Sequence, residues 1–413
     1  MKIKKILSLI LLIIIINLSI ITPSFANVED PDEWNYIWLD EAIEEAQTIK
    51  EPSVLSRYAV VYDRASGTVI WGKDENTPVP MASTTKMMTA IVMMEIVGEE
   101  HLNDTVTVSK EAASTIGSRL GLNTGDKITY NDLLYGLMLC SGNDAAVEIA
   151  ISTTGSVENF VELMNNKAKE LGLQNTHFVT PHGLDRDGHY TTALELAKIV
   201  DYATKNKKVA EVVATKQHTV TINGYPKTIS NTNELLGYLD GVTGGKTGYT
   251  SKAGRCLTTT VNRDGFEIIT VVLGADTRKI RTQDTIKLIE YTYKEYKQVD
   301  IDALVQSEYE NWCRINKRRI RVIKGVELRP EIYIEDGKYK MYPLKTNETI
   351  EIESTANTEF EAPLPKDTEV GKIIVYKGNE IIDEISIKTV EQVERKSIIA
   401  YLFEIAQLIQ ILI

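Results

Sequence analysis

Residues 81–94, MASTTKMMTAIVMM, place Ser83 and Lys86 three residues apart at the entry to an apolar run. The apolar side chains that follow cover nearly the whole circumference of a helix, which predicts a helix running through a core rather than along a surface. Ser83 then lies in its first turn, with the Lys86 side chain beside the hydroxyl. Unpaired N–H groups at a helix start can stabilise an oxyanion, and a lysine shielded from water can activate a serine.

This pair also has an ordinary explanation. A chain of this length is expected to contain roughly one or two Ser-x-x-Lys matches by chance. A serine at a helix start commonly acts only as an N-cap. The catalytic interpretation of Ser83 therefore depends on what the rest of the chain contains.

Composition limits the kind of protein. With 413 residues, 43% hydrophobic and 25% charged, the chain is globular in composition and long enough for two domains plus appendages. Its net charge of −12 argues against a nucleic-acid-binding protein, which would carry a basic face. The three cysteines, Cys140, Cys256 and Cys313, leave at least one thiol unpaired, and we interpret most of them as small buried hydrophobic residues.

Residues 1–26 predict a cleaved secretory signal peptide. Three lysines precede a run at residues 6–16 that is apolar except for Ser8, and Pro23-Ser-Phe-Ala26 places small residues at the two positions that a signal peptidase reads. The apolar run is short for a membrane span. We therefore expect an exported protein.

Hydrophobic periodicity predicts an α+β catalytic domain over residues 27–298. Beyond the helix after Ser83, helices are expected at residues 32–50, 129–139, 144–151, 157–171, 192–204 and 282–296. Strands are expected at residues 58–62, 68–71, 219–222, 227–230, 257–261 and 266–273. The domain is then an antiparallel sheet built from both ends of the segment, with a cluster of helices between them in sequence.

Residues 299–390 predict a separate small all-β domain, a sandwich or a barrel. Short alternating runs recur at residues 319–323, 331–334, 349–352, 373–376 and 381–387. This block offers no constellation of catalytic residue types in its sequence, so we assign it a spacing or interaction role.

Residues 391–413 predict an amphipathic membrane-anchoring helix. Glu404, Gln407 and Gln410 recur at every third position and line one face, which leaves a broad apolar face opposite. Such a helix lies in a membrane interface. A terminal helix that packs into a core or dimerises is the alternative.

Two further tripeptides support the catalytic interpretation of Ser83 and Lys86. Ser141-Gly-Asn143 lies at a break between predicted helices, where a short loop can present a hydroxyl and an amide to a cleft. Lys246-Thr-Gly248 lies at a predicted strand start, where a cation and a hydroxyl project and glycine permits close approach. Each tripeptide alone is weak, but the three motifs in this order are typical of acyl-transfer enzymes that open β-lactams and cut D-alanyl peptides.

With these motifs, the chain resembles a low-molecular-mass penicillin-binding protein, a serine-type D-alanyl-D-alanine carboxypeptidase of the peptidase S11-like family. The resemblance covers the signal peptide, the catalytic domain, the β-rich block and the terminal helix. The segment Phe178-Val-Thr-Pro-His182-Gly-Leu184 is similar to the family's His-Gly-Leu segment beside the active site. The resemblance implies a serine β-lactamase/penicillin-binding-protein-like fold for the catalytic domain.

The resemblance also implies roles for individual residues. Ser83 is the acylating nucleophile, Lys86 its general base, and Ser141 relays a proton towards the leaving amine. Among the implied substrate-binding residues, Asn143 binds the substrate amide, and Lys246 and Thr247 bind the terminal carboxylate. The other implied substrate-binding residues are Gly248, Tyr249 and His182. The N–H groups of Ser83 and Tyr249 form the implied oxyanion hole. Repulsion from Lys246 would help to keep Lys86 neutral.

Other residues near the motifs have weaker functional explanations. A cluster of histidines and aspartates could suggest a metal site, but its spacing fits no common zinc pattern and a shaped loop explains it better; its members are His177, His182, His189, Asp185 and Asp187. Arg278 and Arg281 could assist carboxylate binding, although arginines at a helix start are common on surfaces. Cys140 and Cys256 are each expected near the cleft.

The sequence thus predicts an enzyme that removes the terminal D-alanine from peptidoglycan stem pentapeptides through a Ser83 acyl-enzyme and that penicillin acylates. We expect no cofactor and no metal, and a location at the outer face of the cytoplasmic membrane or in the cell wall. A serine β-lactamase shares the motifs, but residues 182–189 contain no glutamate to position a hydrolytic water. The same motifs are also compatible with a D-alanyl endopeptidase and with a non-catalytic β-lactam or muropeptide receptor.

Overall fold

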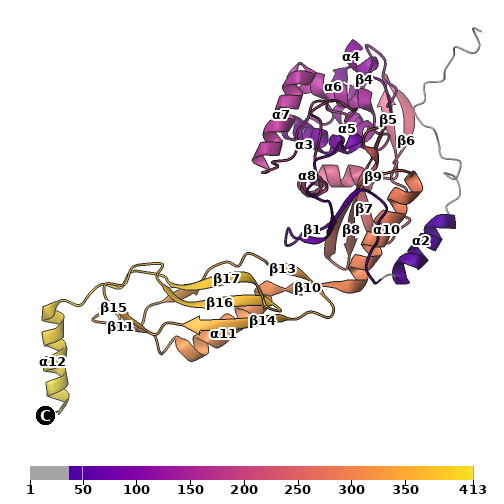
Figure 1. The fold of residues 1–413 in the computed structure, drawn as a ribbon. Helices are drawn as coiled ribbons and strands as arrows, with labels where there is room; N and C mark the ends of the chain where they lie inside the picture. Colours follow the sequence, from indigo (N-terminus) through magenta and orange to yellow (C-terminus); the bar gives the residue numbers. More distant parts are fainter. Residues whose placement is uncertain (1–36, 49, 413) are drawn as a thin grey trace, which may run out of the picture. The chain divides into compact units, whose positions relative to one another are not determined.

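The computed structural model describes residues 37–48 and 50–412, so the predicted signal peptide lies outside the described residues. The chain divides into two compact units (Figure 1). The first unit comprises the chain up to Val61, Trp71–Asn262 and Ile269–Tyr291, and the second comprises Tyr62–Ile70, Arg263–Ile268 and Thr292–Ile413.

A five-stranded sheet in the order β2-β1-β9-β8-β7 joins strands from both ends of the predicted catalytic segment. Its strands are β1 (Tyr58–Asp63), β2 (Val69–Lys73), β7 (Val242–Thr250), β8 (Gly254–Arg263) and β9 (Phe266–Ala275). Two small strand pairs accompany it: β3 (Thr105–Thr107) with β4 (Lys127–Thr129), and β5 (Gln217–Ile222) with β6 (Tyr225–Ser230). Strand β7 pairs antiparallel with β8 and forms one edge of the large sheet.

The helices between these strands gather around α3 (Lys86–Val97), which contacts α5, α6, α7 and α8 (Figure 1). The other helices and the short 3-10 helix are α2 (Ile37–Thr48), η1 (Ala82–Thr85), α4 (Lys110–Ala113), α5 (Tyr130–Met138), α6 (Asn143–Thr154), α7 (Val157–Glu170), α8 (Ala193–Lys205), α9 (Lys207–Ala214) and α10 (Arg278–Glu295). Every residue from Lys86 to Met94 is buried, which confirms the prediction of a core helix.

Two boundaries differ from the sequence prediction. Lys246 lies in the middle of β7 rather than at a strand start, because the glycines beside it keep extended pairing with β8. Helix α10 begins at Arg278, four residues before the predicted start at 282. Thr129 is the N-cap of α5, since its side chain accepts a hydrogen bond from Asp132 N.

The second unit contains the predicted strands and one helix, α11 (Ile301–Asn316), that was not predicted from the sequence. Its strands are β10 (Tyr296–Asp300), β11 (Arg321–Ile323), β12 (Ile332–Ile334), β13 (Met341–Lys345), β14 (Ile350–Ala356), β15 (Glu359–Glu361), β16 (Glu369–Lys377) and β17 (Glu380–Thr389). Strands β12, β17, β16 and β14 form one sheet in that order.

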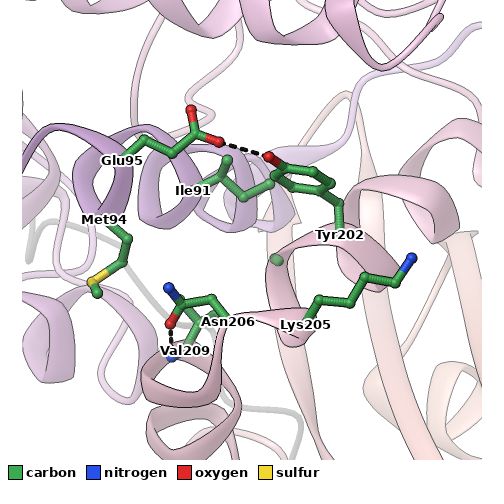
Figure 2. Close-up of a pocket in the computed structure, with 8 residues that line it drawn as sticks. Ile91, Met94, Glu95, Tyr202, Lys205, Asn206 and Val209 are labelled. Carbon is green, nitrogen blue, oxygen red and sulfur yellow. Dashed lines mark hydrogen bonds between the residues drawn. The ribbon is translucent and has the colours of Figure 1, made fainter. Parts of the chain in front are cut away.

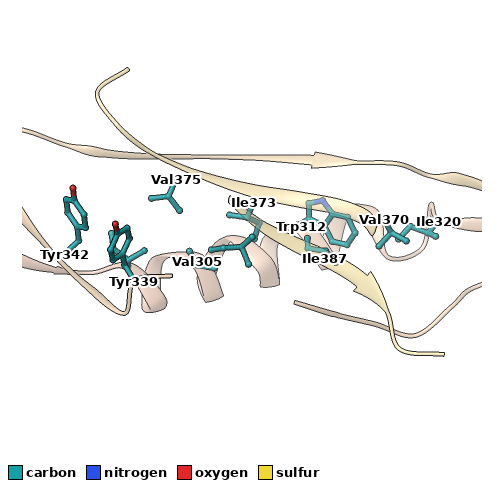
Figure 3. Packing of buried hydrophobic residues seen from close by; sticks show 11 residues of the cluster. Val305, Trp312, Ile320, Tyr339, Tyr342, Val370, Ile373, Val375 and Ile387 are labelled. Atoms are coloured by element: carbon teal, nitrogen blue, oxygen red, sulfur yellow. The ribbon is translucent and has the colours of Figure 1, made fainter. Parts of the chain in front are cut away.

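Helix α11 supplies part of the second unit's core (Figure 3). Its buried residues Ile301, Val305 and Trp312 share one helical face, and they pack with residues such as Ile373 and Ile387 of the sheet. The predicted β-rich block therefore also contains a helix, because α11 packs against strands β14 and β16 of this sheet.

The last described element is α12 (Ile398–Leu412), which confirms a terminal helix. Large apolar side chains along it are exposed, among them Ile398, Leu402, Phe403 and Ile409. Over the described residues, no helix has the length and apolar character needed to cross a bilayer.

We predict that Trp312→Ala destabilises the second unit by about 3–5 kcal/mol, the usual cost of deleting a large buried aromatic side chain. Trp312 is 1% exposed, and its Nε1 donates to the Thr355 carbonyl at 2.8 Å, so truncation leaves a cavity and an unpaired acceptor. The loss of unfolding free energy is measured by amide hydrogen exchange of β16 and β17 in increasing urea. Leu304→Ala on the same helix, at a site 39% exposed, is the control, and an equal effect there would contradict the assignment.

Candidate active site

The candidate nucleophile Ser83 lies in η1, which continues directly into α3. The preceding residue, Ala82, has φ = 50°, a left-handed conformation that is uncommon for a residue with a side chain. Strained backbone of this kind clusters at functional sites. Because η1 runs into α3, the Lys86 side chain reaches back to Ser83, as the spacing predicts, and Nζ lies 2.9 Å from Oγ.

The Lys86 side chain is fully buried among hydrogen-bond acceptors from three segments. Its Nζ donates to Ser83 Oγ at 2.9 Å, to Asn143 Oδ1 at 2.7 Å and to the His182 carbonyl at 3.0 Å. Burial, and then the positive charge of Lys246, lower the pKa of Lys86 well below its usual value, so the predicted repulsion is confirmed. A neutral Nζ can accept the Ser83 proton, whereas a charged ammonium cannot.

The loop between α5 and α6 carries Ser141 and leads into Asn143, as predicted. Asn143 bridges two segments, because its Oδ1 accepts from Lys86 and its Nδ2 donates to the Ile116 carbonyl at 2.7 Å. Ser141 is buried and has a left-handed backbone, φ = 58°. Within residues 37–48 and 50–412 its hydroxyl forms no hydrogen bond, with Lys86 or any other residue.

Asp144 is a supporting residue that was not predicted from the sequence. Its fully buried carboxylate accepts from Leu120 N and Gly121 N at 2.7 Å and from Leu122 N at 3.0 Å. These charge-assisted bonds hold residues 120–122 against the start of α6. The only signal in the sequence was its place directly after the Ser-Gly-Asn tripeptide.

The His-Gly-Leu segment packs directly on η1. Gly183 has φ = 86°, and a Cβ there would lie 1.9 Å from the Ala82 carbonyl oxygen, so only glycine fits. Thr89 Oγ1 donates to the Pro181 carbonyl at 2.5 Å, and Thr85 Oγ1 lies 2.8 Å from His189 Nε2. These contacts clamp the segment to the helix that carries Lys86.

His182 reaches the site through its main chain. Its carbonyl accepts from Lys86, while its ring Nδ1 accepts from Leu184 N at 3.1 Å. Burial, and then the charge of Lys86, lower the pKa of His182 to about 3, so the ring is neutral. His189, one of the candidate metal ligands, instead accepts from Val179 N and contacts Thr85.

Strand β7 carries the Lys-Thr-Gly motif past η1. A Cβ on Gly248 would lie 3.0 Å from Ser83 N, so this glycine permits the close approach. Lys246 is buried, and burial, with a further contribution from Arg281, lowers its pKa to about 7. Thr247 Oγ1 lies 2.6 Å from the hydroxyl of Thr232, a neighbour that the sequence pattern did not indicate.

Tyr249 lies on the edge strand, where N–H groups on the unpaired side are open to a ligand. Its ring is half-exposed, and the Arg255 guanidinium stacks on it at 4.0 Å from the centroid. The next residue, Thr250, donates to Asp185 Oδ1 at 2.7 Å. Asp185, another candidate metal ligand, therefore ties the end of the motif strand to the loop after His182.

The remaining candidates have structural partners. Arg281 and Arg278 both bond to the carboxylate of Glu234, and Arg281 is buried rather than on the surface. All three cysteines are free. The predicted nearness of Cys140 to the cleft is confirmed by its electrostatic interaction with both Lys86 and Lys246, and burial raises the pKa of its thiol.

A pocket of about 270 Å³ lies further along α3 (Figure 2). Its lining consists of Ile91, Met94, Glu95, Tyr202, Ala203, Lys205, Asn206 and Val209. Glu95 there accepts from the Tyr202 hydroxyl at 2.9 Å and pairs with Lys167. None of the motif residues lines this pocket, so the candidate site is separate from it.

A buried lysine beside a serine at a helix start, facing a Ser-x-Asn loop and a Lys-Thr-Gly edge strand, is the arrangement expected for acyl transfer by an activated serine. Two protein-family models match the chain and support the same class of enzyme. One described as D-alanyl-D-alanine carboxypeptidase, peptidase S11, matches residues 45–277, and one described as penicillin-binding protein 5, C-terminal domain, matches residues 317–395. The chain belongs to the D-alanyl-D-alanine carboxypeptidase family.

Individual relatives agree with the family. The chain is 32% identical to the D-alanyl-D-alanine carboxypeptidase DacF of Bacillus subtilis over 84% of this chain and 88% of that protein. The structure of penicillin-binding protein 5 from Haemophilus influenzae is similar in fold, with a TM-score of 0.69 and 24% identity over 84% of this chain and all of that chain. The Streptomyces K15 DD-transpeptidase is 33% identical with a TM-score of 0.56, over 59% of this chain and 98% of that chain.

We predict that Gly183→Ala lowers the rate of Ser83 acylation by about 100-fold, because an added Cβ must push the Ala82 carbonyl and shift the nucleophile by about an ångström. Gly188→Ala is the matched control. It lies in the same loop with φ = 85°, but its Cβ meets nothing closer than 3.7 Å. The rate of acylation by a fluorescent penicillin is measured for both variants. An equal loss of rate in the two would show that backbone strain alone, and not the contact with Ala82, causes the effect.

Proposed function

We propose that this chain is a serine-type D-alanyl-D-alanine carboxypeptidase that removes the terminal D-alanine from peptidoglycan stem pentapeptides and that penicillins acylate at Ser83. The observation that carries the proposal is the buried Lys86 Nζ, which lies 2.9 Å from Ser83 Oγ with a lowered pKa. The family membership supports the same reaction.

In the proposed acylation step, the Ser83 hydroxyl gives its proton to neutral Lys86 and its oxygen attacks the carbonyl carbon of the penultimate D-alanine. The resulting oxyanion lies between the N–H groups of Ser83 and Tyr249. Collapse breaks the peptide bond, and the proton passes from Lys86 through the Ser141 hydroxyl to the departing amine. Water then hydrolyses the Ser83 ester.

Substrate selection in this proposal depends on a carboxylate at one end of the cleft. Lys246, protonated, and the Thr247 hydroxyl bind the terminal carboxylate, and Asn143 binds the peptide amide. A buried cation recognises an anion strongly because little water screens it. The site therefore recognises a free C-terminal carboxylate, as a carboxypeptidase requires.

The domains and the location complete the proposal. We propose a signal peptide at residues 1–26, a catalytic domain at 27–298, a β-rich domain at 299–390 with a spacing or interaction role, and an anchoring segment at 391–413. The exposed apolar side chains of α12 support binding to a membrane surface. The enzyme would then act at the outer face of the cytoplasmic membrane.

We predict that Ser83→Ala abolishes release of D-alanine from diacetyl-Lys-D-Ala-D-Ala, with a loss of about 10⁴-fold or more, because no nucleophile remains. Deletion of residues 391–413 is expected to leave this activity within about twofold. Residual activity of Ser83→Ala near the level of the intact enzyme would refute the proposal. Rapid turnover of a penicillin by the intact enzyme would instead favour a serine β-lactamase.

We predict that the chain without its signal peptide binds phospholipid vesicles through α12. Co-sedimentation should fall at least about tenfold when residues 391–413 are deleted, and several-fold in Phe403→Gln, which removes one exposed apolar side chain. Gln407→Ala is the control and should bind as well as the intact chain. Equal binding with and without the helix would leave the anchor unsupported and favour a packing or dimerising role.

A further inference from the structure

A stretch rich in lysine and arginine runs from the end of helix α11 into β11 and the loop after it. We call residues 314–329 the basic segment. It contains seven basic residues and one acidic residue, Glu327, although the whole chain has a net charge of −12. The basic residues, all of them exposed, are Arg314, Lys317, Arg318, Arg319, Arg321, Lys324 and Arg329. Such a local excess of positive charge attracts an anionic partner.

Acidic neighbours within the second unit neutralise only part of this charge. Glu361 on β15 pairs with Lys324 at 2.6 Å and with Arg395 at 3.5 Å. Glu359 lies opposite Arg321, where β11 and β15 pair in parallel. Across residues 37–48 and 50–412, no acidic side chain forms an ion pair with the other basic residues of the segment, which are Arg314, Lys317, Arg318, Arg319 and Arg329.

Exposed apolar side chains lie among these charges. The Val322 N–H donates to the Leu328 carbonyl at 3.1 Å and closes a loop between them. In and beside that loop, Ile323 is 50% exposed, Val326 is 60% exposed and Leu328 is 57% exposed. The charges alone would suit any anionic partner, but the apolar side chains favour a lipid surface, where they can enter the acyl boundary while the cations contact headgroups.

The backbone joins this loop to the start of α12. Gly325 forms an antiparallel bridge with Arg395, and the Lys396 N–H donates to the Lys324 carbonyl at 2.8 Å. Helix α12 begins two residues after Lys396. Figure 1 shows β11 and β15 near the stretch of chain that leads into α12. The basic segment therefore adjoins the proposed membrane anchor.

The composition of α12 leaves a function for these charges. Its sequence contains one glutamate and no lysine or arginine. The helix thus offers apolar area to a bilayer but no cation to an anionic headgroup. The neighbouring basic segment supplies the cations that the helix lacks.

We propose that the basic segment is a second membrane contact, which binds the anionic headgroups of phospholipids while Val326 and Leu328 enter the interface beside α12. This inference rests on the proposed membrane binding of α12. The helix provides attachment to any bilayer, and the basic segment makes that attachment depend on lipid charge.

Co-sedimentation of the chain without its signal peptide tests the inference with two kinds of vesicle: phosphatidylcholine alone, and phosphatidylcholine with about 30% phosphatidylglycerol. We expect the intact chain to bind the anionic vesicles at least about tenfold more tightly at about 0.1 M salt. Lys317→Gln/Arg318→Gln/Arg319→Gln should remove most of this gain, because each cation near an anionic surface contributes about fivefold. Its binding to neutral vesicles should stay within about twofold of the intact chain.

Two further variants separate local charge from total charge and from structure. Lys297→Gln/Lys338→Gln/Lys340→Gln removes the same number of exposed cations on and beside the β10–β13 pair, and it should keep the full gain. Arg318→Lys/Arg319→Lys retains the charge and should bind as the intact chain does. Amide hydrogen exchange of β16 and β17 should be the same in all of these variants, which checks that the second unit is folded.

The outcomes distinguish this inference from the proposed anchor. Equal binding of the intact chain to both vesicles, with binding lost in Phe403→Gln, would support the anchor and overturn the inference. Binding to neither vesicle would overturn both. An equal loss in the two triple variants would also overturn the inference, because total charge would then explain the gain. If the Lys317 triple variant lost binding to soluble polyphosphate but kept the vesicle gain, the partner would be a soluble anion and not a lipid.

Discussion

The amino group of Lys86 lies in the core of the first unit, and a buried polar group is tolerated only where protein partners replace its water. Those partners come from three places: Ser83 on its own turn, Asn143 at the start of α6, and the His182 carbonyl. The packing of α3 against the other helices and the loop after residue 180 thus creates the site and the lowered pKa together.

Close backbone approach is the second constraint on the site. Gly183 and Gly248 both lie against η1, and a Cβ on either would meet the backbone around Ser83. The left-handed Ala82 and Ser141 add local strain at the nucleophile and at the facing loop. The surrounding contacts hold this strain in place, including the Asp144 bonds to residues 120–122 and the contact between Thr85 and His189.

The second unit has a simpler physical basis. Its core consists of a sheet and the apolar face of α11, with Trp312 packed into the contact and bonded to the Thr355 carbonyl. Among its described residues we find none of the three acyl-transfer motifs, which fits the match to a penicillin-binding protein 5 C-terminal domain. The exposed apolar side chains of α12 follow in the chain and lie outside this core.

The sequence by itself determined the chemistry of the motifs and many of the elements: the core helix after Ser83, the helix break at Ser141, and longer strands such as β1, β9 and β17. Local pattern suffices there because periodicity and turn residues act over a few positions. It did not indicate the short strands β3, β4, β10, β13 and β15. It also did not indicate α11, the place of Lys246 within β7, or the supporting residues Asp144, Thr232 and Glu234. Only the tertiary structure decided these, because the residues that they contact lie far away in the sequence. Burial in the folded chain, not local spacing, determines which charged groups and backbone segments come into contact.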